Sequence, residues 1–169
     1  MNAKAKLFGH PIHQMLIVFP LGLLATSLFF DIAYWSTGNA RWADIAFVMI
    51  ACGIIGGLVA AIFGLIDFLA IPRGTRAKRI GALHGIGNVV VVGLFGVSWL
   101  LRYDNPVAPE LASLILSIAA VGLALITGWL GGELVDRLAV GVDDGAHLDA
   151  PSSLSGKPAR ELASASARR

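Results

Sequence analysis

The sequence predicts an all-α integral membrane protein, a four-helix bundle made of two antiparallel hairpins, followed by a disordered C-terminal tail. The composition is the first reason: of 169 residues, 56% are hydrophobic and 14% are charged, against about 45–50% and about 25% in soluble domains. A chain this apolar cannot cover itself with polar side chains in water, which excludes a soluble enzyme, a disordered chain and a coiled coil. The net charge of +2 gives no reason to expect nucleic acid as a partner.

The second reason is four long stretches without any Asp, Glu, Lys or Arg, at residues 7–30, 45–66, 80–101 and 111–132. As helices they would each reach about 33 Å or more, enough for a hydrocarbon core of about 30 Å. They show no strand-like alternation, and in lipid only a helix or a closed barrel satisfies its own backbone. We therefore expect spans near 10–32, 44–69, 80–102 and 110–134 within a membrane domain, 1–142. The first is longer than a signal-peptide core, so we expect it to be retained.

The distribution of Lys and Arg predicts the orientation, because these residues are enriched in cytoplasmic loops. The segment before the first span and the loop between the second and third spans are the basic ones. Both termini are therefore expected in the cytoplasm, with the polar tail 143–169 mostly disordered there. We expect about a dozen residues in each of the first two loops and fewer than ten in the third, so that successive helices are antiparallel neighbours. Aromatic residues cluster at the opposite, outer ends: Tyr34, Trp35, Trp42, Trp99 and Tyr103.

Six polar residues in or beside the spans fall on the cytoplasmic side at similar depth. They are His10, His13, Asp67, His84, Asn88 and Glu133. Ionisable residues in a span usually face the bundle interior and mark a pathway or a ligand site. Since the first and third spans are diagonal in such a bundle, His13 and His84 are expected to face each other across the core. Each half begins with histidine and ends with a carboxylate, a weak internal repeat.

Three chemistries fit this cluster. The first is haem b with imidazoles as axial ligands, its propionates meeting basic residues of the middle loop such as Arg76 and Arg79. The second is zinc or non-haem iron, with ligands drawn from a wider set: His10, His13, His84, Asp67 and Glu133. The third is a proton path that uses the histidines as carriers. A cluster that only fixes helix packing, without a cofactor, is the remaining alternative.

Several motifs resemble a bacterial membrane-protein family catalogued as domain of unknown function 2231. They are the opening segment 10–20 (HPIHQMLIVFP), the segment 64–67 (GLID), His84 with Asn88, and the segment 128–135 (GWLGGELV). The resemblance covers roughly residues 8–142. It implies a four-span bacterial membrane protein, and because some relatives are joined to a Rieske iron–sulfur domain it favours an electron-transfer setting.

Together these observations favour a multi-pass subunit of the bacterial inner membrane that binds haem b, or next a metal ion, between the first and third spans. His13 and His84 are the expected ligands, with His10 as the substitute for His13. Asp67, Asn88 and Glu133 are expected to orient the rings. Such a subunit would pass electrons to a redox partner or function as a homo-oligomer, rather than being an enzyme itself. A structural or assembly subunit without a cofactor and a small proton-linked transporter are the alternatives.

Overall fold

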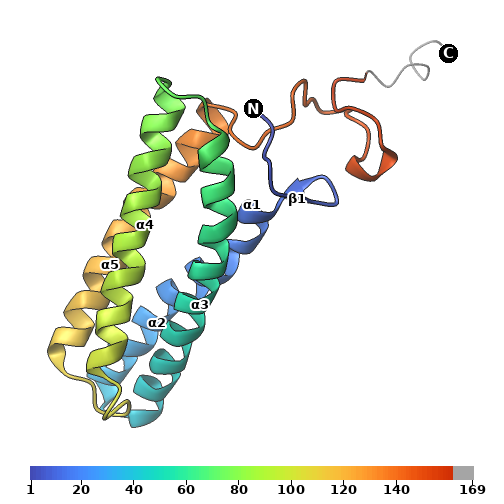
Figure 1. Ribbon diagram of the computed structural model, residues 1–169. Helices are drawn as coiled ribbons and strands as arrows, with labels where there is room; N and C mark the ends of the chain where they lie inside the picture. The colour runs from blue at the N-terminus through green and yellow to red at the C-terminus, as the bar shows by residue number, and fades with distance from the viewer. Residues whose placement is uncertain (162–169) are drawn as a thin grey trace.

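The computed structural model describes residues 1–161. Four long helices form one elongated bundle, and the predicted all-α membrane fold is confirmed (Figure 1). The elements in chain order are β1 (Lys6–Leu7), β2 (His10–Pro11), α1 (Ile12–Leu16), α2 (Val18–Thr37), α3 (Ala40–Ala70), α4 (Arg76–Leu101), α5 (Leu111–Gly132), the π-helical turn η1 (Glu133–Arg137) and the 3₁₀ turn η2 (Ser153–Ser155). In each span at most 22% of the most apolar window is buried inside the protein, so most apolar side chains face outward, as lipid contact requires.

The first span consists of α1 and α2, which are separated at Ile17. Pro20 explains the break, because proline has no N–H to donate to the carbonyl of Leu16 one turn earlier. The helical path continues across the break, since the N–H of Leu21 still donates to the carbonyl of Ile17 at 3.1 Å. His13 therefore lies on the N-terminal extension of α2.

Helices α3 and α4 are longer than their charge-free stretches, and α2 ends seven residues beyond the stretch 7–30, so the first two loops are shorter than expected. Only Gly38 and Asn39 connect α2 to α3, where the sequence indicated about a dozen residues. Gly38 ends α2 in the left-handed conformation at φ 68°, and the Asn39 side chain accepts the N–H of Arg41 to begin α3. Because both helix ends are capped locally, the helices continue past the apolar region. Five residues, 71–75, connect α3 to α4.

Residues 143–161 run irregularly beside the N-terminal segment and include only the short turn η2. The Met1 amine donates to the carbonyl of Ala139 at 2.8 Å, and Lys6 pairs with Asp143. The remainder of the tail predicted to be disordered, 162–169, lies outside the described residues.

The two hairpins, α2 with α3 and α4 with α5, repeat the same burial pattern. Each buried residue of α2 has a buried counterpart on the α4 segment 71 positions later: Pro20 and Val91, Leu24 and Phe95, Ser27 and Ser98, Asp31 and Arg102. Between α3 and α5 the constant spacing is 67 positions: Ala46 and Ser113, Ile50 and Ser117, Gly53 and Ala120, Ala60 and Thr127. Two independent series with constant spacing show that the halves are structural repeats, which strengthens the weak repeat seen in the sequence.

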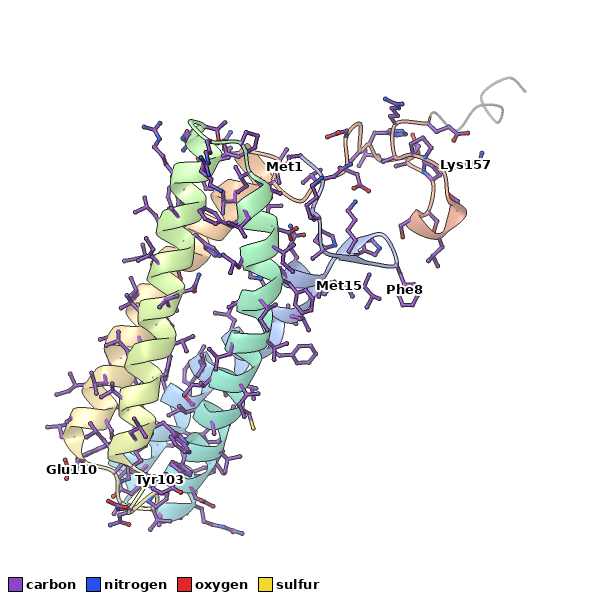
Figure 2. The ribbon with its side chains drawn as sticks, viewed as in Figure 1. Met1, Phe8, Met15, Tyr103, Glu110 and Lys157 are labelled. Carbon is purple, nitrogen blue, oxygen red and sulfur yellow. The ribbon has the colours of Figure 1, made fainter. Side chains whose placement is uncertain are left out.

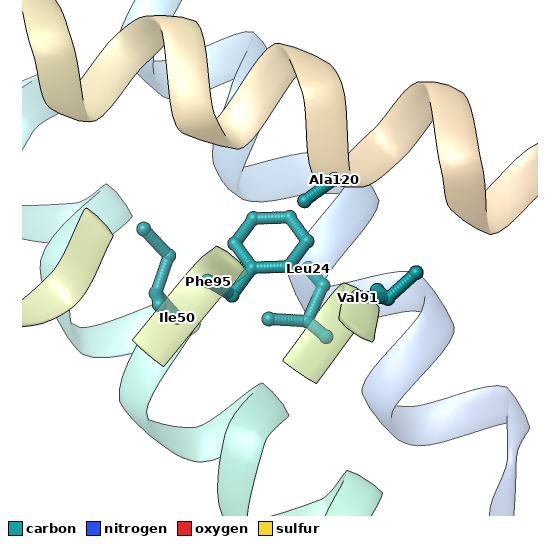
Figure 3. Packing of buried hydrophobic residues seen from close by; sticks show 5 residues of the cluster. All are labelled: Leu24, Ile50, Val91, Phe95 and Ala120. Atoms are coloured by element: carbon teal, nitrogen blue, oxygen red, sulfur yellow. The ribbon is translucent and has the colours of Figure 1, made fainter. Parts of the chain in front are cut away.

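The middle of the bundle is apolar. All four long helices contribute to its central cluster, whose members are Leu24, Ile50, Val91, Phe95 and Ala120 (Figure 3). The extensive contacts are within the hairpins, and the hairpins meet through α3 with α4 and α2 with α5. The first and third spans are therefore diagonal, as predicted.

A buried ion pair joins these diagonal helices at the end of the bundle opposite the histidines. Arg102 binds both carboxylate oxygens of Asp31, at 2.5 and 2.8 Å, and both side chains are almost completely buried. The guanidinium also donates to the hydroxyls of Ser98 and Ser117, each at 3.1 Å. Asp31 and Arg102 directly follow the charge-free stretches 7–30 and 80–101, and their pairing was not predicted from the sequence. It fixes the register of α2 against α4.

Removing one member of this pair is expected to destabilise the bundle by about 3–5 kcal/mol, because the other charge is left buried without a partner. Arg102→Met tests this by reversible unfolding in mixed detergent micelles. The matched control is Arg41→Met, which removes an exposed charge at the same end and should change little.

Adding Asp31→Leu to Arg102→Met removes the stranded carboxylate and should recover most of the stability, since apolar replacements of buried pairs are often neutral or better. A double variant no more stable than Arg102→Met alone would contradict the ion-pair explanation.

Candidate functional site

His13 of α1 and His84 of α4 face each other at the N-terminal end of the bundle. Their ring centroids are 6.4 Å apart, and the ring planes are perpendicular. Each residue is partly buried, and the two lie 71 positions apart, as do the other repeat pairs on these helices. The convergence of the two rings that the diagonal arrangement predicted is therefore present.

Each imidazole is held by a backbone carbonyl of the other helix in its own hairpin. The Nδ1 atom of His13 lies 2.9 Å from the carbonyl oxygen of Ala60 on α3, and Nδ1 of His84 lies 2.8 Å from that of Thr127 on α5. A carbonyl can only accept, so we assign the proton of each neutral ring to Nδ1. The Nε2 atom of each ring then keeps its lone pair available for another partner.

A glycine one turn after each accepting carbonyl lets the ring approach the helix. A Cβ atom at Gly64 would lie 2.8 Å from ring atoms of His13, and one at Gly131 would lie 3.1 Å from Cε1 of His84. The first distance is too short for any side chain, and the second is tight. The two hairpins therefore hold their histidines in the same way. In each, a backbone carbonyl accepts from the ring, and the glycine four residues later leaves space for it.

Asn88 and Thr127 support only the second histidine. The Asn88 amide donates to the backbone carbonyl of His84 at 2.8 Å and accepts from the Thr127 hydroxyl at 3.1 Å. Its nitrogen is 3.3 and 3.4 Å from the two ring nitrogens, and such similar distances place the amide over the ring face rather than along a lone pair. In the first hairpin the equivalent position is Ile17, so the two rings have different surroundings.

The other expected ligands do not join the two rings. Asp67 accepts the backbone N–H groups of Lys4 and Ala5, at 2.6 and 3.1 Å, and so anchors the N-terminal segment to α3. Glu133 pairs with Arg76 at 2.5 Å. His10 lies in β2 with Nε2 3.3 Å from the hydroxyl of Ser153.

Within residues 1–161 no group of three or more His, Cys, Asp or Glu side chains is arranged to hold a metal ion. The expectation that Asp67, Glu133 and His10 share one cluster with the two rings is therefore not met. Each of the three is already engaged with a residue outside that cluster. Asp67 and Glu133 are also not repeat counterparts, because the spacing of 67 pairs Asp67 with Leu134.

The structure thus belongs to the class of four-span membrane bundles built from two repeated hairpins, here with a histidine pair between the diagonal spans. Residues 9–144 match the family described as "Predicted membrane protein (DUF2231)", and the chain belongs to this family. No curated protein and no solved structure matches the chain.

Substituting Gly64 is expected to displace the His13 ring. In Gly64→Ala the added methyl group overlaps the imidazole, and overpacking of this kind costs about 1–3 kcal/mol, which outweighs the gain of about 1 kcal/mol in helix propensity. The measurement is again unfolding in detergent micelles.

The matched control is Gly85→Ala on α4, where an added Cβ would meet nothing within 4 Å. This variant should be unchanged or slightly more stable. Equal stability of the two variants would show that the close approach of Gly64 to His13 is not a packing constraint.

Proposed function

We propose that this membrane protein binds haem b between His13 and His84, and that it transfers electrons to a partner protein. One observation carries the proposal: the two imidazoles face each other and both use Nδ1 on a backbone carbonyl, which leaves both Nε2 atoms without a carbonyl partner. Protein histidines that bind metals typically have their second nitrogen fixed in this way, because it sets the tautomer and the ring orientation.

The separation of the rings supports ligation from opposite sides of one ion. Metal–imidazole bonds are about 2.0–2.1 Å long, and a ring nitrogen lies about 1.1 Å from its centroid. Two rings on opposite sides of an ion would thus have centroids a little over 6 Å apart, whereas a tetrahedral angle would bring them to about 5 Å. The observed 6.4 Å agrees with the first arrangement.

The number of ligands favours haem over a bare ion. A zinc site normally takes three or four protein ligands, and the described residues bring only two imidazoles together. Haem supplies four nitrogen ligands of its own and needs only the two axial ones. A zinc or non-haem iron ion, the second choice, would depend on a ligand from elsewhere.

Basic residues at the same end of the bundle suit the carboxylates of a haem. Arg76 and Arg79 lie in the first turn of α4, less than three turns before His84, and Arg76 is half exposed beside Glu133. With the Lys and Arg distribution, this end is proposed to face the cytoplasm of a bacterial cell. Asn88 would keep His84 oriented.

A structural role without a cofactor is the second candidate, and the same hydrogen bonds favour it. Each histidine ties two helices of one hairpin together through a carbonyl, which is a sufficient use for a polar group in a membrane. A proton path finds less support, because the apolar cluster around Phe95 separates the histidines from the Asp31–Arg102 pair.

The visible absorption spectrum of the purified protein decides between these functions. We expect the Soret band of a haem with two imidazole ligands, and its loss in both His13→Ala and His84→Ala. His10→Ala is the matched control, since this ring lies outside the pair and its removal should leave the spectrum unchanged.

A colourless protein that contains no stoichiometric metal by elemental analysis would refute cofactor binding and leave the structural role. A colourless protein with one equivalent of zinc or iron, lost in His84→Ala, would refute haem and support the metal ion instead. A haem retained in both histidine variants would place it elsewhere in the protein.

A further inference from the structure

The β1–β2 hairpin carries exposed apolar side chains directly before the first span. The hairpin projects sideways from the start of α1, and Figure 2 shows Phe8 at its outer tip, directed away from the bundle. Phe8 is 73% exposed and Leu7 is 47% exposed. Leu154 of the tail, 75% exposed, lines the same shallow surface pocket as Phe8.

The turn itself does not explain a phenylalanine at this position. Phe8 and Gly9 form a two-residue turn with φ angles of 50° and 85°, a conformation that favours Asn, Asp and Gly. A bulky side chain in the left-handed region is unusual and costs conformational energy. The aromatic ring therefore needs a reason outside the turn.

The depth of the hairpin is fixed by Asp67. Its carboxylate holds the backbone of Lys4 and Ala5, and it lies three residues before the end of α3 at Ala70, a rise of about 5 Å. On α3, Leu65 and Leu69 around this level are 56% and 67% exposed, and the ends of α3 and α4 extend beyond the hairpin (Figure 1). The hairpin is therefore level with a helix surface that is still apolar.

The charges beside the tip are compatible with the headgroup layer. Lys6 is paired with Asp143, and Lys4 is exposed, where its side chain can reach lipid phosphates. The outward-facing side chains of the first span follow soon after the tip in the chain: Met15 is 45% exposed and Val18 is 61% exposed. This proximity in the chain to the lipid-facing span favours the bilayer as the occupant, rather than another protein.

We propose that the hairpin inserts Phe8 into the interfacial layer of the bilayer that the helices span, and that Leu154 lies beside it and brings the tail to the membrane surface. Aromatic side chains are enriched in this layer because it accepts an apolar ring next to a polar backbone. In this way the hairpin would hold the N-terminal segment at the membrane surface beside the bundle. The inference does not depend on a cofactor.

Spin-label accessibility in vesicles of phosphatidylethanolamine and phosphatidylglycerol tests this proposal. Cys52 is the single cysteine, so labels are introduced at Phe8→Cys, Val18→Cys and Leu148→Cys in a Cys52→Ser background. Val18 is the lipid-facing reference and Leu148, fully exposed in the tail, is the aqueous one. We expect the label at position 8 to collide with oxygen more than with a water-soluble nickel chelate, as at position 18.

A second measurement places the label beside Phe8 instead of replacing Phe8, and then tests the effect of changing Phe8. A label at Leu7→Cys should also favour oxygen, and adding Phe8→Asp should shift its collisions towards the nickel chelate as the tip leaves the bilayer. Accessibility at position 8 like that at position 148 would overturn the proposal. Dipolar broadening between labels at position 8 at high lipid-to-protein ratio would also overturn it, by placing the tip against a second copy of the chain.

Discussion

Polar groups inside this bundle depend on partners within the protein, because the lipid around them offers none. His13 and His84 meet this requirement with carbonyls of α3 and α5, and Asp31 and Arg102 meet it with each other. The first kind of contact ties the helices within a hairpin, and the second ties the diagonal helices of different hairpins. Between them, these contacts fix the depth and the rotation of α1, α2 and α4 more specifically than the apolar cluster can, since apolar packing has no direction.

The repeat explains why the two ends carry different chemistry. Residues at equivalent positions of the two repeats approach each other between the diagonal helices. A residue that is the same in both repeats therefore meets a second copy of its own side chain and must be compatible with it. Two neutral imidazoles are compatible, and the structure has His13 opposite His84. Two carboxylates or two guanidinium groups buried together would repel each other strongly. The second pair accordingly combines one carboxylate and one guanidinium group, those of Asp31 and Arg102. The two repeats differ at this position because opposite charges attract where like charges would repel.

The sequence predicted the features that depend on long-range patterns and missed those set by local geometry. The four spans and the convergence of His13 and His84 follow from charge-free stretches and helix order. The short connection at Gly38 and Asn39 was missed, because capping extends helices past the apolar region. The carbonyls of Ala60 and Thr127 leave no trace in a sequence, whereas Gly64 and Gly131 could have indicated a close approach. The pairing of Asp31 with Arg102 could have been inferred from opposite charges at equivalent positions of the two repeats.

The repeat also limits which side chains would be available to a cofactor between the diagonal helices. A repeat supplies ligands in pairs, and within residues 1–161 the polar pair at this end is the two imidazoles, because Asp67 has Leu134 as its counterpart and Glu133 is bound to Arg76. A haem, which needs only two ligands from the protein, would suit these two rings better than a zinc ion, which normally takes three or four. The surroundings are nevertheless unequal, since Asn88 lies over the His84 ring and Ile17 takes the equivalent position near His13. A bound haem would therefore have two imidazoles of different hydrogen bonding, and its reduction potential would respond more to substitution of Asn88 than of Ile17.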